Sequence, residues 1–301
     1  MTRQLLVPLP GNDRLADRLA DALGADIGRI AVRRFPDGET YLRYETPING
    51  RSIALLCTLD HPDNKFLPLA FAAAAARDLH AATVGLVSPY LAYMRQDRRF
   101  QAGEAVTSTY FARILSSQID WMVTVDPHLH RRSSLAEIYN IPTAAIHAAP
   151  LISDWVRGNV TAPLLIGPDT ESEQWVSRTA HDAGAPHMVL EKVRHGDRTV
   201  EISFPDMGRW RGHTPVLIDD IVSTGRTMIE AIGHLRREGM RPPVCVAAHG
   251  IFAEGALERL VEAGAARVVT TNTIPHPTNA IDVTTLLAES VRVVAKSAVR
   301  S

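Results

Sequence analysis

Residues 216–228 read Val-Leu-Ile-Asp-Asp-Ile-Val-Ser-Thr-Gly-Arg-Thr-Met, and the interpretation of the rest of the chain starts from this stretch. An apolar run ends in two acids, Asp219 and Asp220, and a polar turn with one glycine leads into a helical pattern at about Thr227. This order predicts a strand, a loop and a helix. Backbone N–H groups and small hydroxyls at such a helix N-terminus can hold a phosphate.

The two acids are expected at the carboxyl end of the strand, where ligands bind in open α/β sheets. Adjacent carboxylates beside a phosphate cradle suit the hydroxyls of a sugar phosphate, or a hard cation bound with it. The alternative is an ordinary strand-to-helix turn with a capping Ser or Thr. Paired acids at a strand end are costly without a ligand, which favours the binding site.

The composition indicates a globular, intracellular chain. Its 301 residues suggest about two domains, and the 46% hydrophobic content is ample for packed cores. The formal net charge of -1 gives no global basic surface for nucleic acid. Cys57 and Cys245 lie in apolar runs and are predicted to be buried free thiols, which fits a reducing compartment. With neither a signal-peptide core nor a membrane-length apolar run, we expect a cytoplasmic protein without a membrane partner.

Strand-like and helix-like segments alternate in both halves, which predicts parallel sheets with helices on both faces. The boundary is expected near Thr143 to Ala149, giving domains of residues 1–146 and 147–301. One early helix is expected to run to about Leu23, with Asn12 as its cap. The sequence leaves open whether the last helix, from about residue 284, packs on the first domain.

Two further turns suggest nucleotide chemistry. Residues 35–39, Phe-Pro-Asp-Gly-Glu, form either a simple surface turn or an exposed aromatic with two acceptors that could stack on a base and bond its amino group. Residues 88–105 form an Arg-rich loop after a predicted strand. Arg95 and Arg98 could clamp a polyphosphate there, and the alternative is a solvated basic loop.

Asp126 directly follows another predicted strand, and His128 and His130 come next. These histidines could bind a metal ion or a metal-bound phosphate, or either could be an ordinary turn residue. The neighbouring Arg131 and Arg132 suggest another anion site. The spacing also resembles part of a zinc site, but no third ligand cluster is visible.

Two features of the second half complete the set. Asp169 follows a strand and could bind Mg²⁺, although this turn could equally serve helix capping through Thr170 or Ser172. Lys192 and Arg194 alternate along a strand and so face one side. They could close over a developing phosphoryl charge, or belong to a solvated strand face.

Together, these motifs resemble the ribose-phosphate diphosphokinase, or phosphoribosyl-diphosphate (PRPP) synthetase, family over nearly the whole chain. The resemblance implies an α/β fold of two tandem type I phosphoribosyltransferase-like domains, each a mainly parallel sheet flanked by helices. The first would be the ATP side and the second the ribose-5-phosphate side. It also implies transfer of the diphosphoryl group of ATP to the C1 hydroxyl of ribose 5-phosphate, giving PRPP and AMP, with Mg²⁺ as cofactor.

The resemblance assigns roles residue by residue. The adenine of ATP would be held by Phe35, Asp37 and Glu39 of a neighbouring subunit. This sharing implies a homo-oligomer, either a dimer or a multiple of dimers. ATP would also contact Arg95, Gln96, Asp97 and His128, and the metal–nucleotide site would use His128 and Asp169. Lys192 and Arg194 would stabilise the transition state. The ribose hydroxyls would bind Asp219 and Asp220, and the 5-phosphate would bind Ser223, Thr224, Gly225, Arg226 and Thr227.

Three positions depart from the common family pattern. Pro127 follows Asp126, Ser223 stands where an acid is frequent, and Arg226 replaces a small residue. These departures indicate a divergent branch. Two alternatives to the diphosphokinase function as a whole stay open. One is a nucleobase phosphoribosyltransferase, which would consume PRPP and need no ATP, and the other is a catalytically silent regulatory relative.

Overall fold

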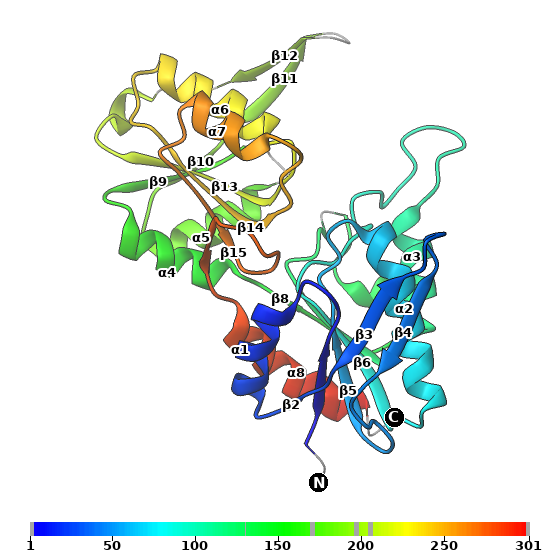
Figure 1. The fold of residues 1–301 in the computed structure, drawn as a ribbon. Coiled ribbons are helices and arrows are strands. Elements are labelled where there is room, and N and C mark those ends of the chain that lie inside the picture. Colours follow the sequence, from blue (N-terminus) through cyan, green and yellow to red (C-terminus); the bar gives the residue numbers. More distant parts are fainter. Residues whose placement is uncertain (1–2, 130, 169–171, 196–198, 204–206, 299–301) are drawn as a thin grey trace. The chain divides into compact units, whose positions relative to one another are not determined.

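Two parallel sheets of six strands each form the framework of the chain in the computed structural model (Figure 1). The structure describes residues 3–129, 131–168, 172–195, 199–203 and 207–298. The chain divides into two compact units. The first comprises Met1–Ile146, Thr273–Pro275 and Val283–Ser301, and the second comprises His147–Asn272 and His276–Asp282.

The sheet of the first unit has the strand order β2-β1-β5-β6-β7-β8, and every neighbouring pair is parallel. Its strands are β1 (Leu5–Pro8), β2 (Asp26–Ile27), β5 (Ser52–Leu56), β6 (Thr83–Ser88), β7 (Trp121–Val125) and β8 (Thr143–Ile146). Helix α1 (Asp13–Leu23) packs beside α8 (Thr284–Ala298), and α2 (Pro62–Asp78) packs beside α3 (Thr107–Ser116). The strand order grows outward from β1 in both directions, so right-handed crossovers place these helix pairs on opposite faces.

The second unit repeats this plan with the parallel order β10-β9-β13-β14-β15-β16. Its strands are β9 (Pro163–Gly167), β10 (His187–Val189), β13 (Thr214–Val222), β14 (Val244–Gly250), β15 (Arg267–Thr271) and β16 (Asn279–Ile281). Helices α4 (Ala149–Asn159) and α5 (Glu173–Ala183) pack together, as do α6 (Arg226–Arg237) and α7 (Ala256–Ala263). The predicted α/β class, with two mainly parallel sheets flanked by helices, is confirmed.

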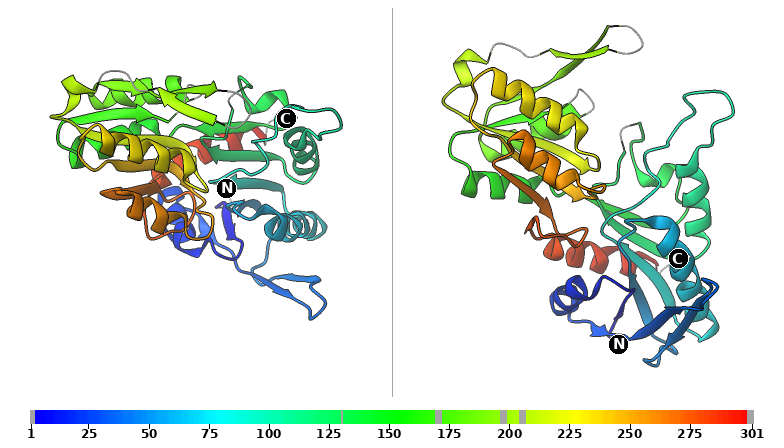
Figure 2. Two further views of the ribbon diagram at one scale, coloured as in Figure 1. Left: turned by 90° about the horizontal axis from the view of Figure 1, so that it is seen from above. Right: turned by 45° about the horizontal axis from the view of Figure 1, so that its top comes forward.

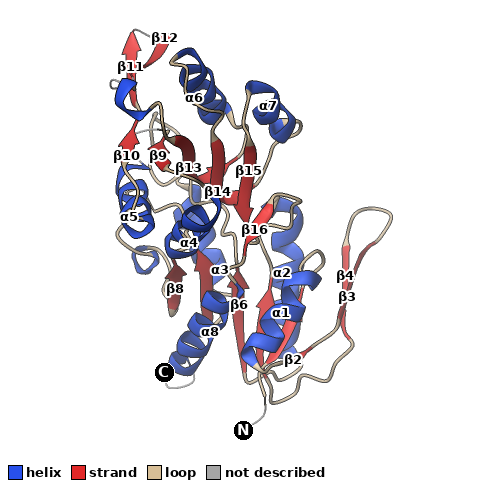
Figure 3. Ribbon diagram, turned by 90° about the vertical axis from the view of Figure 1, so that its left-hand side faces the viewer, coloured by secondary structure: helices blue, strands red, loops and turns tan. Residues whose placement is uncertain are grey.

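Each unit inserts an antiparallel hairpin directly after the short outer strand of its sheet. In the first unit the hairpin is β3 (Ile30–Arg34) with β4 (Thr40–Tyr44) (Figure 3). Strand β4 packs against α2, where the Tyr44 hydroxyl donates to the carbonyl oxygen of Ala72 at 2.8 Å. In the second unit it is β11 (Glu191–His195) with β12 (Thr199–Ser203), which extends away from that unit's sheet (Figure 2). Both predicted motifs that lie outside the sheets, the Phe35 turn and the Lys192–Arg194 strand, are therefore carried by equivalent hairpins.

The two units exchange their last helices. Helix α4 follows β8, the last strand of the first sheet, yet it packs against α5 in the second unit. Helix α8 follows β16, the last strand of the second sheet, yet it packs against α1, β7 and β8 in the first unit. Arg292 of α8 also bonds the carbonyl oxygen of Ala22. The structure thus places the last helix on the first unit, a choice that the sequence left open.

Several local expectations need correction. Asn12 precedes α1, but its side chain makes no capping hydrogen bond. Its amide instead donates to the carbonyl of Leu9 at 3.0 Å, and its Oδ1 accepts the N–H of Thr58 at 3.0 Å, so it ties the ends of β1 and β5 together. Strand β13 continues two residues past the acids, to Val222, instead of ending at them. Across the described part of the chain, no helix is long and apolar enough to cross a membrane.

Both cysteines are free and buried, as predicted. Burial raises the pKa of the Cys57 and Cys245 thiols to about 12, because a thiolate would lose its hydration there. We expect a thiol-reactive chromogenic reagent at pH 8 to label neither cysteine in the native protein and both after unfolding in urea. Raising the pH from 7 to 9 should not accelerate native labelling in proportion to hydroxide, as it does for an exposed thiol. One rapidly labelled native thiol would contradict this expectation.

Candidate functional site

The loop that follows β13 is fixed by the neighbouring strand end. The carbonyl oxygen of Val222 accepts the N–H groups of Ile251 at 3.0 Å and Phe252 at 3.1 Å. The carbonyl oxygen of Ser223 accepts the N–H of Ala253 at 3.0 Å. These three bonds join the segment after β13 to the segment after β14, so the loop has a defined shape before any ligand binds.

The loop opens directly into α6. Gly225 is the N-cap of that helix in the left-handed conformation, with φ 71°, and no side-chain hydrogen bond caps the helix. Thr224 and Arg226 are exposed, whereas Ser223 and Thr227 are half-buried. An α-helix leaves its first N–H groups without helical partners. Together with the hydroxyls of the loop, these donors form the kind of cradle that accepts a phosphate.

Asp219 and Asp220 are the sixth and seventh of the nine residues of β13 and are half-buried. The N–H of Asp220 donates to Oδ1 of Asp219 at 2.9 Å. One oxygen of Asp219 is therefore engaged within the chain. Both acids lie at the carboxyl end of a central strand, three to four residues before the phosphate-type cradle begins.

Replacing Gly225 measures how far the stability of the fold depends on the left-handed backbone conformation at this residue. A Cβ there would be held at a positive φ and would lie 3.3 Å from Cγ of Leu260, so Gly225→Ala should destabilise the fold by about 1–2 kcal/mol. Gly233, inside α6, is a matched control because a Cβ there would meet only the end of the Arg237 side chain, at 3.6 Å. We expect Gly233→Ala to stabilise by about 0.5–1 kcal/mol. Urea unfolding of both variants measures the difference, and equal effects would contradict the conformational argument.

Three predicted residues of the second unit lie partly or wholly outside the described residues. Asp169, with the alternative cap Thr170, lies outside the described residues. Lys192 and Arg194 lie on β11, where they pair in register with Ile202 and Val200 of β12, but their side chains lie outside the described part of the structure.

In the first unit, Phe35 sits at the tip of the β3–β4 hairpin. Its N–H donates to the carbonyl of Glu39 at 2.8 Å, and the N–H of Glu39 donates to Oδ1 of Asp37 at 3.1 Å. The ring is 39% exposed, and the Arg33 guanidinium lies 4.7 Å from its centroid. The turn therefore presents an aromatic face and two exposed carboxylates in a fixed arrangement, which suits recognition of a base.

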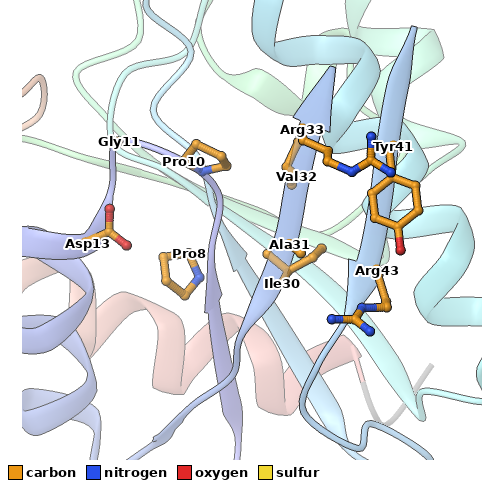
Figure 4. A pocket seen from close by; sticks show the side chains of 10 residues that line it. All are labelled: Pro8, Pro10, Gly11, Asp13, Ile30, Ala31, Val32, Arg33, Tyr41 and Arg43. Carbon is orange, nitrogen blue, oxygen red and sulfur yellow. The ribbon is translucent and has the colours of Figure 1, made fainter. Parts of the chain in front are cut away.

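A pocket of about 660 Å³ lies between this hairpin and the segment that follows β1 (Figure 4). Arg33, Tyr41 and Arg43 line it from the hairpin, and Pro10 and Asp13 line it from the other side. Figure 4 shows the Arg33 guanidinium beside the Tyr41 ring, 4.1 Å from its centroid. The predicted adenine residues do not line this pocket, so it is a feature separate from the Phe35 turn.

The loop after β6 carries three of the predicted ATP contacts, and their side chains differ in exposure and in bonding. Arg95 is exposed. Oε1 of Gln96 accepts the Thr107 hydroxyl at 3.1 Å. The side chain of Asp97 is only 4% exposed, and its two carboxylate oxygens lie 3.2 and 3.4 Å from Nη1 of Arg131. Gln96 and Asp97 are thus engaged within the chain, whereas the side chain of Arg95 is exposed, and the contact of all three with ATP stays a prediction.

Asp126, the residue that follows β7, has an unusual backbone conformation. Its φ is 33°, and its N–H donates to the carbonyl of Ile146 at 2.8 Å. His128 follows, half-buried, and His130 lies outside the described residues. Tyr93 and Phe252, in the segments after β6 and β14, also have positive φ angles. Positive φ angles also occur at His80 and Ala162, which precede β6 and β9, so this backbone strain is found at both ends of the strands.

Several residues that follow these strands were missed from the sequence. Phe252 and Ala253 fix the phosphate-type loop, and the Phe252 ring stacks on His276, with centroids 4.4 Å apart. The Tyr93 hydroxyl bonds Asp63, and this hydrogen bond is the main reason that the pKa of Tyr93 rises to about 12. The available signal was topological: in a parallel sheet, segments that follow neighbouring strands lie side by side.

Two family matches and a set of relatives agree with this geometry. Residues 5–118 match the N-terminal domain of ribose phosphate pyrophosphokinase, and residues 134–286 match a phosphoribosyl transferase domain. The chain is 32% identical over 272 residues to a ribose-phosphate pyrophosphokinase of Sulfolobus acidocaldarius, covering 89% of this chain and 92% of that protein. The chain belongs to the ribose-phosphate pyrophosphokinase family. The resemblance drawn from the sequence is therefore confirmed.

Other members of the family match over equally long stretches. A ribose-phosphate pyrophosphokinase of Methanothermobacter thermautotrophicus is 30% identical over 289 residues, covering 96% of this chain and all of that protein. The crystal structure of phosphoribosylpyrophosphate synthetase from Mycobacterium smegmatis superposes with a TM-score of 0.86 over 98% of this chain and 100% of that chain, at 24% identity. The superposition shows that the fold is that of the family.

Proposed function

We propose that this protein transfers the diphosphoryl group of ATP to the C1 hydroxyl of ribose 5-phosphate, releasing PRPP and AMP. The observation that carries the proposal is the preformed loop of residues 219–227, with two carboxylates and a helix N-terminus, in a chain that also has the family's N-terminal domain. The hydroxyl oxygen bonds to the β-phosphorus while the bond from that phosphorus to the bridging oxygen of AMP breaks. The hydroxyl proton passes to solvent.

The proposed roles are those that the family resemblance implies for these residues. In the first unit, Phe35, Asp37 and Glu39 would hold adenine, and Arg95 would bind the phosphates, with His128 near the metal–nucleotide site. In the second unit, Asp219 and Asp220 would bind the ribose hydroxyls, and Ser223 to Thr227 would hold the 5-phosphate. Lys192 and Arg194 would neutralise the charge that develops on the transferred group. Phosphoryl transfer relies mainly on positioning and charge neutralisation, which suits a site without an obvious acid or base.

The described residues suit magnesium better than a protein-caged metal. Among them, no group of three or more His, Cys, Asp or Glu side chains is arranged to hold an ion. Mg²⁺ usually keeps several waters and takes one or two carboxylates together with substrate phosphates. Asp219 and Asp220 offer such oxygens, and His128 and Asp169 are the other proposed contacts. When bound, the ion would neutralise phosphate charge and polarise the hydroxyl.

One assay tests the proposal against both alternatives. Purified protein should release AMP from ATP only when ribose 5-phosphate and Mg²⁺ are both present, and PRPP should form in equal amount. A nucleobase phosphoribosyltransferase would instead consume PRPP with a base and ignore ATP. A silent regulatory relative would bind nucleotide and release no AMP under any salt or phosphate condition, and that result would overturn the proposal.

The proposed sharing of adenine between subunits has its own test. An inactive Phe35→Ala variant and an inactive Lys192→Ala variant should recover part of the activity when mixed and allowed to exchange subunits, because some neighbouring pairs then contain one intact set of groups. A mixture that stays inactive while exchange is demonstrated would place the Phe35 turn at its own subunit's site.

A further inference from the structure

Two adjacent arginines, Arg131 and Arg132, lie in the segment that follows β7 and contact the loop that follows β6. The sequence suggested an anion site for this pair. In the structure, each guanidinium is engaged with the chain instead. Arg131 lies against the Asp97 carboxylate and 5.6 Å from the centroid of the exposed Phe100 ring. The Arg98 guanidinium lies 4.6 Å from the same centroid, so two arginines contact the Phe100 ring.

Arg132 makes the more extensive contacts. Its side chain is only 16% exposed. Nη2 donates to the carbonyl oxygen of Asp97 at 3.3 Å, to the Ser108 hydroxyl at 3.4 Å and to the Thr109 hydroxyl at 3.2 Å. One guanidinium group therefore joins the segment after β7, the Arg95 loop and the first turn of α3.

The opposite side of Arg132 is held by a carboxylate. Nη1 lies 3.9 Å from Oε2 of Glu137. Glu137 is itself oriented by Ser133, whose N–H and hydroxyl both donate to Oε1 at 2.7 Å. These Ser133 hydrogen bonds are the main cause of a lowered pKa at Glu137. Arg132 therefore contacts both the oriented Glu137 carboxylate and the loop.

We infer that Arg132 is a positioning residue, which together with Asp97 presets the Arg95 loop for the nucleotide without touching the nucleotide. Arginine suits this task because its planar group offers five N–H donors in a rigid fork, whereas lysine concentrates its charge at one atom. A loop held at three points does not have to be ordered again when ATP binds, which lowers the cost of binding. The inference rests on the proposed function, because it takes ATP as the ligand of Arg95.

The test compares Arg132→Gln and Arg132→Lys with Arg14→Gln, a matched change at an exposed arginine on α1. Hydrogen exchange reports the amides of residues 96–109, and calorimetry reports the binding of Mg·ATP and of ribose 5-phosphate separately. In Arg132→Gln we expect local exchange and the ATP dissociation constant each to rise by about tenfold, the effect of losing a charge-assisted hydrogen bond. Arg132→Lys should fall between this variant and the wild type. Ribose 5-phosphate binding and the Arg14→Gln control should not change.

Each other outcome overturns the inference. Unchanged exchange with weaker ATP binding would mean that Arg132 contacts the nucleotide directly. Faster exchange throughout the first unit would mean that Arg132 stabilises the whole unit. Unchanged exchange with unchanged ATP binding would mean that the Arg132 contacts neither order the loop nor affect ATP affinity. If the wild type itself fails to bind ATP, the proposed function fails, whereas the exchange of residues 96–109 still reports whether Arg132 holds the loop.

Discussion

Replacing Lys192 with alanine will lower turnover by about 100- to 1,000-fold, the usual cost of removing one preorganised donor from a developing anion. The dissociation constant for Mg·ATP should change little, because the lysine is proposed to act on charge that appears during the transfer. Steady-state AMP release gives the turnover, and calorimetry without ribose 5-phosphate gives the affinity. Arg194→Ala should show the same separation of the two quantities, because it is two residues along the same strand.

Lys296→Ala is the matched control, since Lys296 is an exposed lysine on α8. It should behave as the wild type in both measurements. A Lys192→Ala enzyme with near-normal turnover would remove the assigned role. A large loss of ATP affinity with little loss of turnover would instead make Lys192 a ground-state ligand.

Changing Asp220 to asparagine will weaken ribose 5-phosphate binding by about 10- to 100-fold, because a hydrogen bond to a charged acceptor is lost in a half-buried site. Asp219→Asn should also leave the local backbone in place, since the amide oxygen can still accept the Asp220 N–H. Calorimetry with ribose 5-phosphate measures the loss, and the ATP dissociation constant should stay within about twofold of the wild type, the scatter expected when no contact to that ligand changes.

Asp182→Asn provides the control in the same unit, because Asp182 is exposed at the end of α5. It should leave both affinities unchanged. Unaltered ribose 5-phosphate binding in both Asp219→Asn and Asp220→Asn would contradict the ribose-hydroxyl assignment. Equal weakening of ATP and ribose 5-phosphate would point to a general loss of structure at the end of β13.

Much of the fold was predictable because its signals are local. The apolar run up to Asp219, the polar turn and the helical pattern from Thr227 lie within one short stretch, and the structure forms the predicted strand, loop and helix there. The alternation of strands and helices also predicted parallel sheets, because a helix between two strands brings the chain back to the end of the sheet at which the first strand began. Boundaries were less accurate, as the extension of β13 to Val222 shows. Pairing with β14 continues past the acids, and that pairing depends on residues far along the chain.

The candidate site likewise contains residues that the sequence identified and contacts that it could not reveal. Ser223 to Thr227 and the Phe35 turn were recognisable because backbone conformation and residue type are coupled in tight turns. The engagement of Arg131 and Arg132 with Asp97 was not, because a guanidinium reads the same in sequence whether it faces solvent or a buried carboxylate. Asn12 gives a second case. Its position suggested a helix cap, but the nearby N–H of Thr58 offers a partner that sequence does not reveal.

The sequence by itself determined the α/β class, the repeated strand–helix plan, the family and the loop of residues 219–227 as a candidate phosphate site. Only the tertiary structure decided that α4 and α8 each pack with the sheet of the other half, that Phe252 and Ala253 fix the phosphate-type loop, and that Arg132 joins two strand ends. The physical reason is the range of the interactions. Backbone conformation and hydrophobic periodicity are set by neighbours in the chain, whereas the choice of packing partner depends on surfaces that exist only after the sheets have formed.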